Sequence, residues 1–120
     1  MLTVQLETLG DLAVVECEGR IVRSEAVFKL RDAVMSQAAA RIIVLDLSEV
    51  RAIGGGGVGM LMFLQRWACD HDIRLKLFSP SRSVVDGLEH HSSIRNFEIA
   101  NLHEMMILLA YADSRYPLAA

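Results

Sequence analysis

The chain has 120 residues, of which 52% are hydrophobic and 22% are charged, and its net charge at pH 7 is −3. This length suits one domain with one hydrophobic core, and the composition excludes a largely disordered chain. Acidic and basic residues are mixed along the sequence, which argues against a nucleic-acid interface or a polybasic membrane anchor.

The chain begins with an alternating pattern, unlike the basic and apolar blocks of a signal peptide. No uncharged apolar run approaches the ~18 residues that cross a bilayer. Cys17 and Cys69 lack metal-site spacing, so we expect buried thiols in a reducing compartment. These features predict a cytoplasmic protein that is not inserted in a membrane.

The first segments predict a β-hairpin. Residues 2–7 alternate between apolar and polar side chains, and residues 12–18 resume this alternation after a Gly10-Asp11 turn. Gly19 interrupts the second strand, and we expect residues 21–22 to continue it after a bulge.

A helix and a buried strand follow. Ser24 is expected to cap a helix that reaches about Ala39. Its apolar stripe has helical spacing and consists of Val27, Leu30, Val34 and Ala38. Residues 41–47 are almost continuously apolar, which is typical of a central strand covered on both faces.

The second half alternates helices with strands. The expected elements are a helix after Gly59 to about Asp70, a strand at residues 73–78, a short helix capped by Ser81 or Ser83, a strand at residues 97–99, and a last helix capped by Asn101. This order predicts an α/β fold with a mixed sheet and about four helices packed mainly on one face. We expect one domain over residues 1–112 and a C-terminal tail at residues 113–120.

Four consecutive glycines, residues 54–57, precede the second helix. A run of glycines loses much backbone entropy on folding, although a flexible loop without a role is one explanation for it. Gly54, Gly56 and Gly59 also match the G-x-G-x-x-G dinucleotide fingerprint. The context argues against that site, because residues 49–53 separate the expected strand from the glycines and the next strand ends without an acidic residue. Generic anion binding at this helix N-terminus stays open.

A third interpretation comes from resemblance. The segment from Asp46-Leu47-Ser48 through Ile53 to Gly57-Val58-Gly59 resembles the central motif of STAS domains. In the anti-sigma factor antagonists of that family, the motif commonly contains D-S-S where this chain has glycines at residues 54–56. Weaker matches in the same order cover most of the chain, and the resemblance implies a single STAS-like domain.

The resemblance also implies a function and one departure from it. In the family, an unphosphorylated antagonist binds a serine kinase that also sequesters a sigma factor, and phosphorylation of the loop serine breaks the complex. The position matching that serine is Gly56, which has no hydroxyl. We therefore expect a protein-binding module whose phosphorylation switch is lost, and Ser48 at a strand end is a poor substitute.

The helix after the glycines is apolar nearly all round in its first turns, which leaves a surface for a neighbouring helix or a partner. Met60 and Met62 are candidates for such a surface, whereas Trp67 is expected in the core. The expected partner-binding residues are Ser48, Arg51, Gly54, Gly55, Gly56, Gly57, Val58 and Met62.

Other chemistry has little support. Adjacent His90 and His91 would point about 100° apart on a helix and could not readily share a metal. His71 and His103 are expected to be exposed near helix ends, and no nucleophile elbow is present. We expect no enzyme, metal or cofactor.

The predicted partner is an anti-sigma factor with serine kinase activity or another STAS protein, and a homodimer stays open. The alternatives are a scaffold or transporter-associated STAS subunit, and a sensor that binds a small ligand or nucleotide at the glycines. These functional expectations depend on fold analogy.

Overall fold

The computed structural model describes residues 1–91 and 94–115. Its elements are β1 (Leu2–Leu9), β2 (Leu12–Ile21), α1 (Ser24–Met35), β3 (Ile42–Ile53), α2 (Gly55–Asp70), β4 (Arg74–Phe78), α3 (Arg82–His91), a 3-10 helix (Ile94–Asn96), β5 (Glu98–Ala100) and α4 (Leu102–Arg115). The predicted order of strands and helices is confirmed.

The five strands form one mixed sheet in which spatial order equals chain order, β1-β2-β3-β4-β5. β1 and β2 are antiparallel and joined at Gly10, whose φ of 60° suits glycine. β2, β3, β4 and β5 run parallel, so each later connection needs a crossover, and α1, α2 and α3 provide these crossovers.

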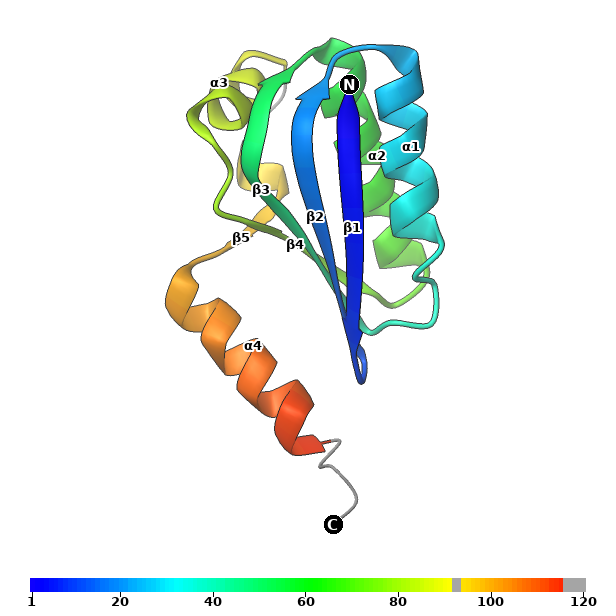
Figure 1. Cartoon of the computed structure of the whole chain (residues 1–120), viewed down its shortest axis with the longest axis vertical. Coiled ribbons are helices and arrows are strands. Elements are labelled where there is room, and N and C mark those ends of the chain that lie inside the picture. The colour runs from blue at the N-terminus through cyan, green and yellow to red at the C-terminus, as the bar shows by residue number, and fades with distance from the viewer. Residues whose placement is uncertain (92–93, 116–120) are drawn as a thin grey trace.

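The helices cover both faces of the sheet unequally. In Figure 1, α1 and α2 lie together on one side of the sheet, and α4 lies on the other and extends away from the strands. The main core cluster fills the side of α1 and α2 and includes Leu30, Leu45 and Leu64, each fully buried. A smaller cluster under α4 contains Leu12, Val14, Val44, Met105 and Ala112. The expected packing mainly on one face is confirmed.

β3 is longer than its sequence pattern predicted, and it is irregular. It pairs with β2 until Ile53, which lies opposite Ile21. Between its pairs with Glu16 and Glu18 and again between those with Gly19 and Arg20, β3 contains one more residue than β2. Such bulges bend a strand and increase its twist. The irregular half of β3 leads directly into the glycines.

α1 differs from the prediction at both ends. Ser24 is its first helical residue, and the N-cap is Arg23, which makes no capping side-chain hydrogen bond. The helix ends at Met35, and turns occupy residues 36–39. The apolar spacing continued to Ala38, but that residue is exposed, so no packing extends the helix there.

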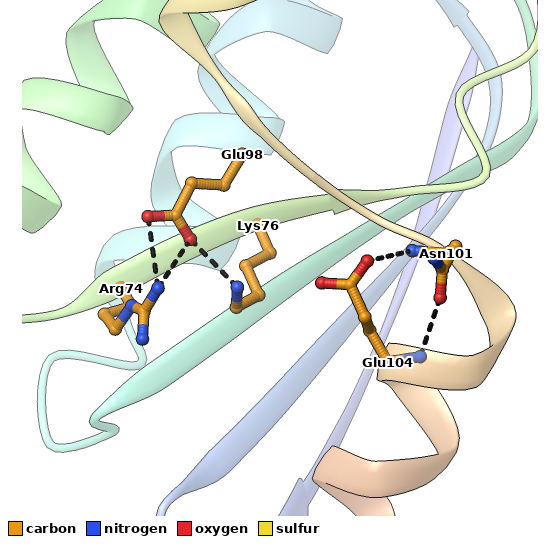
Figure 2. Close-up of polar contacts among 5 residues, drawn as sticks. All are labelled: Arg74, Lys76, Glu98, Asn101 and Glu104. Carbon is orange, nitrogen blue, oxygen red and sulfur yellow. Dashed lines mark hydrogen bonds and ion pairs between the residues drawn. The ribbon is translucent and has the colours of Figure 1, made fainter.

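Figure 2 shows polar contacts that join β5 to β4 and others that cap the start of α4. Glu98 on β5 accepts hydrogen bonds from Arg74 at 3.1 Å and Lys76 at 2.9 Å, both on β4. Asn101 caps α4 as predicted, because its Oδ1 accepts the Glu104 N–H at 2.8 Å while Glu104 accepts the Asn101 N–H at 3.3 Å. α4 continues through residues 113–115, which were expected in a tail, and residues 116–120 lie outside the described part of the chain.

Candidate functional site at the start of helix α2

The glycines form the first turn of α2, and the predicted helix start after Gly59 is wrong. Gly54 is the N-cap, with extended backbone at φ −98° and ψ 178°, and its N–H donates to the Ile21 carbonyl at 3.0 Å. The Val58 N–H then donates to the Gly54 carbonyl at 3.0 Å, which closes the first helical turn. The end of β2 therefore fixes where α2 begins.

Gly57 is required by packing. Its φ lies outside the left-handed region, as it does for the other glycines of this segment. A Cβ at Gly57 would lie 2.7 Å from both the Ile21 carbonyl oxygen and Ile53 Cγ1, too close for any larger residue. Gly87 on α3 also packs against Ile53, because a Cβ at Gly87 would lie 2.6 Å from Ile53 Cγ2. Glycine thus lets two helices pack closely on the end of β3.

Gly56 and Gly59 have no such requirement. A Cβ at either residue would meet nothing within 4 Å, and both residues are exposed. Gly55 is exposed as well and lies beside the His91 imidazole. A Cβ at Gly55 would lie 3.4 Å from His91 Cε1. Three glycines therefore expose bare helical backbone, at a cost in conformational entropy that the packing of the chain does not explain.

Two large apolar side chains continue this exposed strip. Met62 and Phe63 lie seven residues after Gly55 and Gly56, on the same side of the helix, and are 42% and 51% exposed. The opposite side of α2 is buried and consists of Gly57, Val58, Leu61, Leu64 and Ala68. We define the α2 outer surface as Gly55, Gly56, Gly59, Met62 and Phe63.

The predicted partner-binding set divides along this helix. Gly55, Gly56 and Met62 lie on the α2 outer surface, and Gly54 precedes it. Two members do not lie on this surface: the Val58 side chain is 1% exposed, and Gly57 faces Ile21 and Ile53.

Phe63 was missed as a partner-binding candidate. The apolar first turns of α2 indicated excess apolar surface, but helical spacing alone did not decide which residues face outward. Met60, the other methionine proposed, is partly buried and packs against the main core.

Ser48 lies away from the α2 outer surface. Four residues of β3 lie between it and Ile53, so the two residues are roughly 16 Å apart along the strand. Its hydroxyl donates to Asp46 Oδ1 at 2.7 Å, and it lines a small groove of about 80 Å³ with acidic residues that include Glu16 and Glu18. Arg51 is exposed near the second bulge of β3.

The gap that was expected between the strand and the glycines is absent. β3 extends to Ile53, so the glycines follow their strand with no intervening loop. The bulges displace the hydrophobic pattern, and residues 49–53 therefore did not resemble a strand. As expected, β4 ends at Phe78 without the acidic residue that a dinucleotide site places at the end of this strand.

The remaining candidate side chains make local contacts. His71 Nδ1 lies 2.8 Å from the Trp67 carbonyl, the His90 and His91 rings meet edge to face, and Trp67 packs against the main core as expected. In the part of the chain that the structure describes, no group of three His, Cys, Asp or Glu residues could hold a metal ion.

The two cysteines differ in environment. Cys17 is buried, and burial together with the Asp46 carboxylate raises its pKa to about 12. Cys69 is exposed, so the expectation that both thiols are buried is wrong for this residue. It stands near the end of α2, where only the inner stripe is covered by the sheet.

No protein-family model matches the chain, and neither does any curated protein sequence. The fold does match solved structures. An anti-sigma factor antagonist from Mycobacterium paratuberculosis superposes with a TM-score of 0.75 at 16% identity, over 92% of this chain and 95% of that one. The antagonist SpoIIAA in its unphosphorylated form superposes with a TM-score of 0.71 at 18% identity, over 98% of this chain and all of that one.

A further match comes from the stressosome, a signal integration and transduction hub, with a TM-score of 0.66 at 18% identity over 89% of this chain and 96% of that one. These likenesses establish that the chain has the fold of the anti-sigma factor antagonists, the STAS fold expected from the sequence. In the described residues, none of the helices combines the length and apolarity needed to traverse a bilayer.

Proposed function

We propose that this chain is a non-catalytic STAS module that binds a regulatory protein through the α2 outer surface. The observation that carries this proposal is the combination of exposed backbone at Gly55, Gly56 and Gly59 with exposed Met62 and Phe63. Glycine allows a partner to approach the helix backbone closely, and an aromatic side chain with an adaptable thioether supplies apolar contact area.

The proposed mode of action is partner switching without serine phosphorylation at this surface. SpoIIAA, which shares the fold, has been solved in phosphorylated as well as unphosphorylated form. Here the position that resembles the phosphoacceptor is Gly56, and the nearest hydroxyl along β3, Ser48, is hydrogen-bonded to Asp46. The proposed partner is an anti-sigma factor with serine kinase activity or another STAS protein.

The experiment is affinity capture from the native host with wild-type protein and Gly56→Asp, read by mass spectrometry. Aspartate should leave the fold intact, because a Cβ fits at Gly56 and an acidic residue suits the first turn of a helix. In the bound complex, however, the carboxylate would be desolvated against the partner. We expect wild type to capture a serine kinase or a STAS protein and Gly56→Asp to lose it.

Two controls make the result specific. Phe63→Ser should lose the same partner, and Thr8→Asp, an exposed residue at the end of β1, should keep it. Capture of the same partner by wild type and both surface variants would contradict the proposed surface. Absence of any regulatory protein from the wild-type sample would contradict the proposed function itself.

A further inference from the structure

A second feature lies beside the glycine segment, around the start of α1. A cavity of about 740 Å³ opens between the end of β2 and the first turns of α1. This volume is within the range of small-molecule sites in proteins, about 300–1,000 Å³. The cavity is separate from the α2 outer surface, because none of that surface's residues line it.

The charge of this cavity opposes that of the whole chain. The chain has a net charge of −3, yet the cavity is lined by the basic side chains of Arg20, Arg23 and Lys29 and by one carboxylate, Glu25. None of these three cations takes part in the ion pairs that Arg31, Arg41, Arg74 and Lys76 form elsewhere in the described residues. The cavity therefore brings together three cations that form no ion pair within the described residues, beside a single carboxylate.

The backbone adds to the same potential. Arg23 is the N-cap of α1, a helix of 12 residues, and no side chain caps its first N–H groups. Free N–H groups and the helix dipole favour an anion at this end. Arginine guanidinium groups bind phosphate and carboxylate through two parallel hydrogen bonds, and two arginines line the cavity.

Part of the wall is apolar. Leu2, Val22 and Ala26 line the cavity together with the charged groups. Val22 is 49% exposed, so it leaves apolar surface for a ligand to cover. An inorganic anion would use only the charged part of this wall, whereas a ligand with an apolar portion would use both.

We propose that this cavity binds a small molecule in which a phosphate or carboxylate group is joined to an apolar portion. Arg20, Arg23 and Lys29 bind the anionic group, and Leu2, Val22 and Ala26 contact the apolar portion. The assignment is independent of the proposed protein-binding function. Because Val22 also lies 3.8 Å from the Cβ position of Gly54, a bound ligand would adjoin the segment from which α2 starts.

The test is titration followed by amide NMR and calorimetry with four probes: AMP, octanoate, adenosine and inorganic phosphate. We expect AMP or octanoate to bind with a Kd below about 1 mM, and adenosine and inorganic phosphate to bind more weakly. AMP and octanoate distinguish a phosphate from a carboxylate ligand. Failure of both to bind, or equal binding of adenosine, would overturn the proposal.

Charge variants provide a second test, because the proposal predicts whether each one raises or lowers the Kd. Arg23→Gln should raise the Kd about tenfold through loss of a charge-assisted hydrogen bond. Glu25→Gln should lower the Kd about twofold by removing the one carboxylate of the wall, an effect that damage to the fold would not produce. Arg82→Gln on α3, outside the cavity, is the matched control and should leave the Kd unchanged; a change equal to that of Arg23→Gln would indicate unspecific attraction and overturn the site.

Discussion

Gly56 and Gly57 are neighbours of the same type, but they lie on opposite sides of α2. Gly57 contacts the Ile21 carbonyl and Ile53, whereas Gly56 faces open space. The first glycine of this pair is therefore free to vary as far as packing is concerned, and the second is not. Gly57 is therefore explained by folding. Gly56 is not, because an exposed glycine without a packing role only reduces stability, and a role in binding would explain it.

Alanine substitutions test this contrast. Gly56→Ala should raise the free energy of unfolding by about 0.5–1 kcal/mol, because the unfolded chain loses conformational freedom and the helical φ suits alanine. Gly57→Ala should lower it by about 1–3 kcal/mol through overpacking against β2 and β3. Denaturant unfolding of both variants and wild type measures the two effects, and a stability loss at Gly56 would contradict the open space.

The two thiols should react at very different rates. Cys69 is exposed, whereas the Cys17 thiol is buried and its pKa is raised to about 12 by burial and by Asp46. A thiol reagent at pH 8 should modify one thiol in the native protein and two in denaturant, because only thiolate reacts. Cys69→Ser is the control and should leave no rapidly reacting thiol, so rapid native reaction of that variant would contradict the burial of Cys17.

The raised pKa of Cys17 also makes the free energy of unfolding depend on pH at high pH. The ordinary pKa of 9.0 applies to the unfolded chain, and the folded value is about 12. Between these values the unfolded chain has lost the proton that the folded chain still holds. Stability therefore falls as pH rises through this window.

At the scale of single elements, β5 has only three residues and pairs with β4 over three positions. Its side-chain contacts involve Glu98, which lies between Arg74 and Lys76 (Figure 2). The hydrogen bond from Lys76 and the charges of both cations hold the pKa of Glu98 below its ordinary value of 4.5. A short edge strand thus gains support from charged residues of its neighbour.

Glu98→Gln should lower the free energy of unfolding at pH 7 by less than about 1 kcal/mol, since this partly exposed cluster is screened by solvent. Because the folded pKa is depressed, the contribution is present above pH 4.5 and is lost as pH falls through the folded pKa. Unfolding curves of wild type and variant should therefore converge in acid. A difference that persists at pH 2 would show that packing, and not charge, causes the effect.

At the scale of the whole molecule, the sheet has a large core on one side and a small one on the other. Leu64 belongs to the main cluster and is fully buried, whereas Met105 belongs to the small cluster under α4 and is 7% exposed. α4 extends away from the body, and the molecule measures 48 Å along its longest axis against 26 Å across (Figure 1). The main core should therefore carry most of the stability.

Two truncations measure this asymmetry. Leu64→Ala should lower the free energy of unfolding by about 3–5 kcal/mol, and Met105→Ala by about 2 kcal/mol, because the site under α4 can relax more easily. Denaturant unfolding compares the two variants. An equal loss at both positions would show that α4 is as firmly packed as α2.

The order of the elements, the hairpin, the mixed α/β class and the STAS-like fold could all be predicted from the sequence. The first three follow from local signals such as the alternation in residues 2–7 and the cap at Asn101, and the STAS-like fold follows from the resemblance of residues 46–59 to the motif of that family. Such signals depend on residues that are close in the sequence, so they can be recognised without knowing how the chain packs.

Three features depend on contacts between segments far apart in the sequence: the exposed side of α2, the extent of β3 and the grouping of basic side chains. Val58 and Phe63 are both apolar residues of α2. Val58 is buried because it lies on the side of the helix that packs against the core, whereas Phe63 lies on the other side and is exposed. The extension of β3 to Ile53 depends on pairing with β2 across two bulges. The cavity near Arg20 and Lys29 likewise joins a strand end to a helix start, a proximity that folding creates.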